Sequence, residues 1–228
     1  QKALKLEPDH TKAHYNLGVI YMKINKLSKS IAEFKKTLKT EPGHAEAYVN
    51  LGVVFYGQGL PEEAITAYNR ALEIKPDYAE AYYNASFAYL KKGLIEDAIN
   101  MLKKGIELNP DRGLLYFLLG NAYSDKGLLD EAITAWENAI AKNQKHYKAY
   151  NNLGFAYYSK GLVDMAIASL KSAIEIKENY AEAHYHLGSI YIEKEMLKEA
   201  VSELNRTIEL KPDHTKAHYN LGLIYRHL

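Results

Sequence analysis

The stretch DHTKAHYNLG occurs twice in the chain, at Asp9–Gly18 and letter for letter at Asp213–Gly222. The two copies lie 204 residues apart (213 − 9), and 204 is six times 34. A fixed internal period of a few tens of residues is typical of repeat architectures. Read at a period of 34, with Thr11 as repeat position 1, the whole 228-residue chain aligns with itself.

Five repeat positions keep one kind of residue through most of the chain. Position 8 is nearly always glycine, position 11 aromatic, position 20 small, position 24 bulky and position 32 mostly proline. Position 8 holds Gly18, Gly52, Ser86, Gly120, Gly154, Gly188 and Gly222. Position 11 holds Tyr21, Phe55, Tyr89, Tyr123, Tyr157, Tyr191 and Tyr225.

These positions predict two helices per repeat. Apolar residues at positions 4, 7, 8 and 11 form one face of a helix, and those at positions 20, 24, 27 and 28 form a face of a second one. Small residues at positions 8 and 20 let the two helices approach closely, with the bulky residue of position 24 beside the contact. Glycines such as Gly59 at position 15 are expected to end the first helix in the left-handed conformation, and proline at position 32 to stop the second. Asp77, Asp111 and Asp213 are expected to cap the helix that follows.

The pattern resembles the tetratricopeptide repeat family, whose 34-residue unit carries an aromatic residue, Leu-Gly, Tyr, Ala, Phe, Ala and Pro at these positions. The resemblance covers the entire chain. It implies an all-α, right-handed superhelical solenoid of antiparallel helix pairs, with the first helices lining a concave groove. The sequence begins and ends within a repeat, so we expect a segment of a longer array. The predicted single array, 1–228, has a partial repeat 1–10, full repeats 11–44, 45–78, 79–112, 113–146, 147–180 and 181–214, and a half repeat 215–228.

Composition excludes several classes of function. The net charge of +1 gives no general attraction to nucleic acids or acidic membranes, and without cysteine no disulfide or thiolate site is available. No apolar run is long enough for a membrane span, and the absence of a signal-peptide core favours the cytoplasm over secretion. No phosphate-binding glycine loop, GxSxG or HExxH motif occurs, so we expect no catalytic site and no cofactor. Histidines such as His10, His14, His184 and His186 are interpreted as packing or repeat-junction residues, not metal ligands.

Asparagine recurs at repeat position 6, which the resemblance places in the groove. A side-chain amide both donates and accepts a hydrogen bond, so it can hold a peptide backbone whatever its sequence. The row resembles the asparagine ladder of the arrays in O-linked N-acetylglucosamine transferases. The alternative is that these amides bridge neighbouring repeats or are simply inherited with the repeat. The row consists of Asn16, Asn50, Asn84, Asn152 and Asn220.

Aromatic and aliphatic residues at other groove positions predict an anchor for side chains of a partner. At position 6 the fourth repeat has Leu118 instead of asparagine, with Leu114 and Phe117 beside it; local repacking is the alternative. Tyrosine at position 5 is typical of interfaces, although it could also pack on the next repeat. The candidate groove residues beyond the asparagine row are Tyr15, Tyr83, Phe87, Leu114, Phe117, Leu118, Asn121, Phe155 and Tyr185.

The pattern as a whole indicates a non-catalytic protein–protein interaction scaffold that binds an extended peptide or partner segment. The two-carboxylate clamp of chaperone-binding tetratricopeptide proteins is missing, because position 5 has no lysine and position 6 no arginine. One alternative is a substrate-recruiting array of a larger enzyme such as a glycosyltransferase. Another is head-to-tail self-association through Gln1–Leu6 and Thr215–Leu228.

Overall fold

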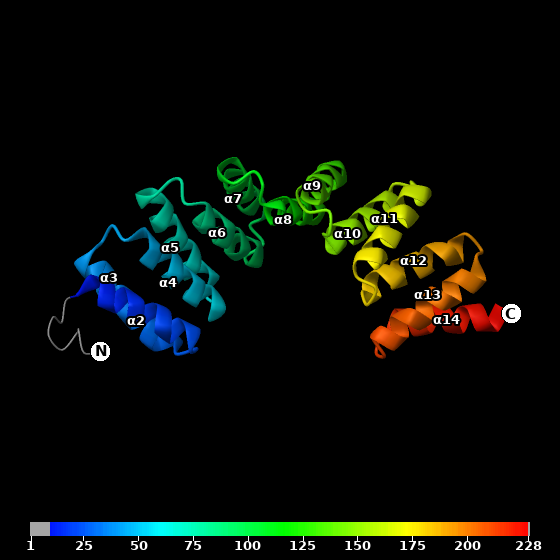
Figure 1. Cartoon of the computed structure of the whole chain (residues 1–228), viewed down its shortest axis with the longest axis horizontal. Helices are drawn as coiled ribbons and strands as arrows, with labels where there is room; N and C mark the ends of the chain where they lie inside the picture. The colour runs from blue at the N-terminus through cyan, green and yellow to red at the C-terminus, as the bar shows by residue number, and fades with distance from the viewer. Residues whose placement is uncertain (1–9, 228) are drawn as a thin grey trace. The chain divides into compact units, whose positions relative to one another are not determined.

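The computed structural model describes residues 10–227, and this part of the chain folds into α-helices without a strand (Figure 1). Each repeat contributes two helices joined by a short turn, as the sequence predicted. The first helices are α2 (Thr11–Lys23), α4 (Ala45–Gly57), α6 (Ala79–Lys91), α8 (Gly113–Asp125), α10 (Tyr147–Ser159), α12 (Ala181–Glu193) and α14 (Thr215–His227). The second helices are α3 (Leu27–Thr40), α5 (Pro61–Ile74), α7 (Ile95–Leu108), α9 (Leu129–Lys142), α11 (Val163–Ile176) and α13 (Leu197–Leu210).

The second helices end at the same repeat position whether or not proline follows. Gln144 and Glu178 stand where the other repeats have proline. Nevertheless α9 and α11 stop where their sisters stop, at C-cap residues Asn143 (φ −147°) and Lys177 (φ −141°). Proline is therefore not required to end the second helix, although it disfavours continuation of that helix where it is present.

The turn between the two helices of a repeat uses a left-handed residue at position 15. Gly59 has a φ of 79° and Gly161 a φ of 74°, which confirms the predicted role of glycine here. Beyond Gly59, the Leu60 N–H donates to the Phe55 carbonyl at 3.0 Å, as in a Schellman ending. Glu195 adopts the same conformation, with a φ of 58°, although it has a side chain.

Glycine at position 8 is required by close packing inside the repeat. A Cβ added at Gly52 would lie 2.5 Å from Tyr68 Cε1, and one added at Gly154 would lie 2.6 Å from Leu170 Cγ. Real Cβ contacts are not that short, so the prediction that this position must lack bulk is confirmed for Gly52 and Gly154. The bulky residue of position 24 lies directly on the glycine and not beside it.

The predicted helix caps were wrong by one residue. The N-cap is position 34, because the first helix begins at position 1, and an aspartate at position 33 is too early to serve. His44 Nδ1 accepts a hydrogen bond from the Ala47 N–H at 3.3 Å, and His146 does the same for Ala149 at 3.3 Å. Asp77 and Asp111 precede the N-cap residues Tyr78 and Arg112, and Asp213 precedes His214, whose Nδ1 accepts from the Ala217 N–H at 3.2 Å.

The chain divides into two compact units, Gln1–Lys126 and Gly127–Leu228. The boundary falls at the turn after α8, inside the predicted repeat 113–146, and a single array over the full chain stays a prediction. In the first unit Val49, Tyr68 and alanines of α5 and α6 form a buried core; in the second, Leu170, Leu187 and Leu204 are almost fully buried. Within residues 10–227, no helix combines the length and the apolar character that a membrane crossing requires.

Candidate functional site

The asparagine at position 6 joins neighbouring repeats at one junction of the first unit. Asn50 Nδ2 donates to Tyr15 Oη at 3.0 Å. The Tyr15 ring in turn stacks on His44, the N-cap residue of α4, with ring centroids 4.7 Å apart. The bridging that the sequence left open as an alternative therefore describes Asn50, which keeps its carbonyl oxygen and one amide N–H for a ligand.

The second unit repeats this geometry with a different residue. His186 occupies position 6, and its Nδ1 lies 3.1 Å from Asn151 Oδ1, at position 5 of the preceding repeat. Tyr185 packs on His214 with ring centroids 4.6 Å apart. In both units, position 5 thus contacts position 34 of the same repeat and position 6 of the next repeat.

Asn84 differs from Asn50 because its preceding neighbour at position 5 is Val49, which has no polar side-chain atom. The Asn84 side chain is half-buried, and no hydrogen bond from it to another residue is found within the described part of the chain. Asn16 is exposed on α2, Asn220 is half-buried on α14, and Asn152 accepts from Asn151 Nδ2 at 3.4 Å. The asparagine ladder stays a prediction.

The predicted anchor around Leu118 is mostly covered. Leu118 is 8 % exposed, whereas Leu114 is 37 % exposed and Phe117 is half-buried. Phe87 packs edge-on against Tyr83 at 5.0 Å, and the Arg112 guanidinium lies 4.1 Å from the Tyr83 ring centroid. Tyr83 is therefore held by a cation–π contact with Arg112, the N-cap residue of α8. Asn121, also on α8, is half-buried.

Phe155 is the most open of the predicted aromatic residues, with 55 % of its surface exposed. It lies on α10 beside a hollow of about 220 Å³ in the second unit. The predicted residue Tyr185 is in the same lining. The hollow is lined by Phe155, Tyr158, Leu170, Tyr185, His186, Ser189, Ile190 and Lys216.

The walls of this hollow are aromatic and its floor is apolar. The His186 ring centroid lies 5.6 Å from that of Phe155 and 5.7 Å from that of Tyr185. Leu170 is fully buried and Ile190 is 2 % exposed, so both are fixed by the core of the unit. The hollow is thus a preformed apolar depression on the face made by α10, α12 and α14.

Electrostatics distinguish the two ends of the hollow. Burial lowers the pKa of His186, and the nearby His214 and Lys216 act in the same direction, against the opposite influence of Glu182. Tyr158 donates to a Glu193 carboxylate oxygen; this bond, with burial and the carboxylate charge, raises the pKa of Tyr158 to about 12. His186 is therefore neutral at pH 7. At the other end of the hollow, the Glu193 carboxylate accepts a hydrogen bond from Tyr158.

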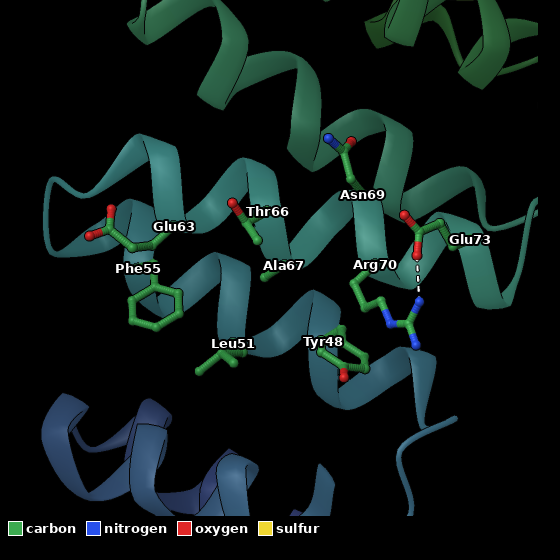
Figure 2. Close-up of a pocket in the computed structure, with 9 residues that line it drawn as sticks. All are labelled: Tyr48, Leu51, Phe55, Glu63, Thr66, Ala67, Asn69, Arg70 and Glu73. Atoms are coloured by element: carbon green, nitrogen blue, oxygen red, sulfur yellow. Dashed lines mark hydrogen bonds and ion pairs between the residues drawn. The ribbon is translucent and has the colours of Figure 1, made fainter.

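A larger hollow of about 550 Å³ lies over α4 and α5 in the first unit (Figure 2). Its charged side chains neutralise one another in part, since Arg70 pairs with Glu73 at 2.5 Å. None of the groove residues predicted from the sequence lines it. The lining consists of Tyr48, Leu51, Phe55, Glu63, Thr66, Ala67, Asn69, Arg70 and Glu73.

The paired histidines lie at repeat junctions and against carboxylates. His14 Nδ1 lies 2.6 Å from Glu33, and His184 Nδ1 lies 2.6 Å from Glu203. Burial alone would lower the pKa of His184, but hydrogen bonds with Glu203 and the Glu178 carbonyl outweigh it and raise that pKa. Over residues 10–227 no group of three or more metal-ligating side chains is found.

Sequence reasoning missed an ion-pair ladder between consecutive repeats. Lysine at position 14 pairs with an acid at position 18 of the preceding repeat, 30 residues earlier: Lys92 Nζ lies 3.0 Å from Glu62, and Lys194 lies 3.4 Å from Asp164. The same pairing recurs between Lys126 and Glu96 and between Lys160 and Asp130. The recurrence of lysine at position 14 and of an acidic residue at position 18 could have predicted these ion pairs from the sequence. Such exposed pairs contribute little to the stability of the fold.

Comparison with known proteins agrees with this architecture. Family models described as tetratricopeptide repeats match residues 15–79 and 55–123, and one described as TPR repeat matches 120–161, 156–195 and 188–227. A crystal structure of MamA is 32 % identical with a TM-score of 0.69, and the match covers 71 % of this chain and 95 % of that one. The structure of YrrB, described as a TPR protein with an unusual peptide-binding site, is 25 % identical with a TM-score of 0.69, covering 83 % and 97 %.

PilF of Pseudomonas aeruginosa has a TM-score of 0.78 at 18 % identity, over 93 % of this chain and 96 % of that one, and supports the fold alone. No curated protein matches the chain. The fold and the in-phase residues define an all-α solenoid of repeated helix pairs. The chain belongs to the tetratricopeptide repeat family, as its sequence pattern indicated.

Proposed function

We propose that the protein is a non-catalytic interaction module that binds a peptide segment of a partner protein on the first-helix face of its second unit. The observation that carries this proposal is the hollow beside Phe155, whose ring is more than half exposed next to a rigid apolar floor. An exposed aromatic ring that borders a rigid apolar hollow is typical of a protein-binding surface. The YrrB structure, described as having a peptide-binding site, supports the same use of the fold.

We propose a separate peptide contact in the first unit, at Asn84. Its amide faces no hydrogen-bonding side chain at position 5 of the preceding repeat, so it can both donate to and accept from a peptide backbone. Asn50 offers less, because one of its two amide N–H groups is already donated to Tyr15. Within the first unit, a backbone grip of this kind would supply affinity that does not depend on the sequence of the peptide.

Selection from a random peptide display library on the purified chain tests the proposal. The selected peptides should lose most of their affinity for Phe155→Ala and keep it for Met165→Ala. Met165 is a matched control because it is 47 % exposed in the same unit but lies on the second helix α11, away from the hollow. Equal loss in both variants, or no selected peptide at all, would refute peptide binding at this face.

A further inference from the structure

The hollow of the second unit has the size of one side chain. Its volume of about 220 Å³ exceeds that of the roughly 150 Å³ apolar cavity known to hold a benzene molecule. Leu170 and Ile190 close the floor, so an entering group can be neither charged nor a folded element of a partner. One phenylalanine or leucine side chain fits these limits.

Charge on the rim selects what lies next to that side chain. Lys216 of α14 is exposed and forms no ion pair with a described residue. Of the residues that line the hollow, it alone carries a formal charge at neutral pH, since burial lowers the pKa of His186. Two carboxylates lie near the hollow but outside its lining: Glu193 is engaged by Tyr158, and Glu182 acts on the His186 ring.

An aromatic lining could instead hold a quaternary ammonium or a methylated lysine, as aromatic cages do. Such cages work by attracting a cation to the ring faces. The Lys216 ammonium in the same lining opposes a second positive charge, and no lining residue supplies a carboxylate. The charge balance of the hollow therefore favours an anionic neighbour over a cationic occupant.

We infer that the partner segment inserts a large apolar side chain between Phe155 and Tyr185 and places a carboxylate, from an adjacent acidic residue, against Lys216. This inference rests on the proposed function and specifies its ligand. It assigns two separate roles, because Phe155 decides whether a peptide binds and Lys216 decides which charge is preferred beside the anchor.

Three synthetic peptides test it, each with one phenylalanine followed by aspartate, asparagine or lysine in a neutral glycine–serine context. Binding is followed by NMR titration of backbone amides in α10, α12 and α14. The aspartate peptide should bind roughly threefold more tightly than the asparagine peptide at low ionic strength, and the lysine peptide should bind weakest. Lys216→Glu should reverse this order, whereas Lys198→Glu, an equal charge change on α13, should preserve it.

The outcomes separate the two levels of the argument. If all three peptides bind at this face with equal affinity, or if Lys216→Glu leaves their order unchanged, the acidic preference is refuted and peptide binding stands. If a trimethyllysine peptide binds more tightly than the aspartate peptide, the anionic assignment is also refuted. If no peptide shifts the amides of α10 and α12, the proposed function itself fails.

Discussion

Replacing Gly52 by alanine should destabilise the first unit by about 2 kcal/mol, because the new methyl group has no space. It would lie 2.5 Å from Tyr68 Cε1 and 2.8 Å from Cδ1 and Cζ. Tyr68 is 1 % exposed and cannot move without displacing its own neighbours. Overpacking of this severity costs about 3 kcal/mol, and the better helix propensity of alanine returns about 1 kcal/mol.

Gly222→Ala is the matched control. Gly222 has the same repeat position in α14, but a Cβ there would meet nothing within 4 Å. This variant should therefore be stabilised by about 1 kcal/mol through helix propensity alone. The difference of about 3 kcal/mol between the two variants isolates the packing cost from the backbone effect.

Urea unfolding followed by circular dichroism measures both changes, and amide hydrogen exchange locates them. Repeat arrays unfold in parts, so exchange protection in α4 and α5 should fall for Gly52→Ala while α12 and α13 keep theirs. Equal stabilisation by the two alanine variants would show that the position 8 glycine is not required by packing, and the account of the repeat core given above would be wrong.

Three further results are expected. Glu195→Gly should stabilise the second unit by about 1 kcal/mol in urea unfolding, because glycine adopts a φ of 58° without strain. His184→Gln should cost more stability near pH 6 than near pH 8.5, because the raised pKa of His184 makes its pairing with Glu203 fully effective below about 6.5 and lost above the folded-state pKa. Asn84→Ala should weaken binding of an extended peptide more than Asn50→Ala, with helicity unchanged.

Each of these expectations has a result that contradicts it. Destabilisation by Glu195→Gly would mean that the side chain makes a contact worth more than the strain it imposes. A pH-independent effect of His184→Gln would show that the ring is neutral in the folded protein throughout this range. Equal loss for the two asparagine variants would place the amides in the joints between repeats and remove them from the binding surface.

Residue size and backbone conformation were the predictable part of the fold. Glycine at position 8 indicates a close helix contact, and glycine at position 15 indicates a left-handed turn. Both can be predicted, because each depends on the local sequence and recurs every 34 residues. The first helices, the left-handed turns and the contact of Gly52 with Tyr68 follow from them. The caps were predicted wrongly because aspartate is a common N-cap residue. The local sequence does not show that the helix begins at Ala79, two residues after Asp77, so that Tyr78 is the N-cap.

The candidate site was less predictable, because exposure depends on neighbours some 35 residues away. The residues around Asn50 and Asn84 do not show that they differ. Asn50 is bonded to Tyr15, whereas the corresponding residue of the repeat before Asn84 is Val49. Leu118 was expected to be open and is almost covered, whereas Phe155 is open. The proposed role of Lys216 could not be predicted from the sequence, because it depends on the hollow that the structure shows.

The hydrogen bond between Asn50 and Tyr15 spans 35 positions, and the ion pair between Lys92 and Glu62 spans 30. The partners of both contacts therefore lie in adjoining repeats. Excision of residues 45–78 would bring Asn84 to the place of Asn50, opposite the same tyrosine. Gene duplication or deletion in steps of one repeat can thus lengthen or shorten the molecule while each joint stays chemically matched, so array length can evolve separately from the residues that select a ligand.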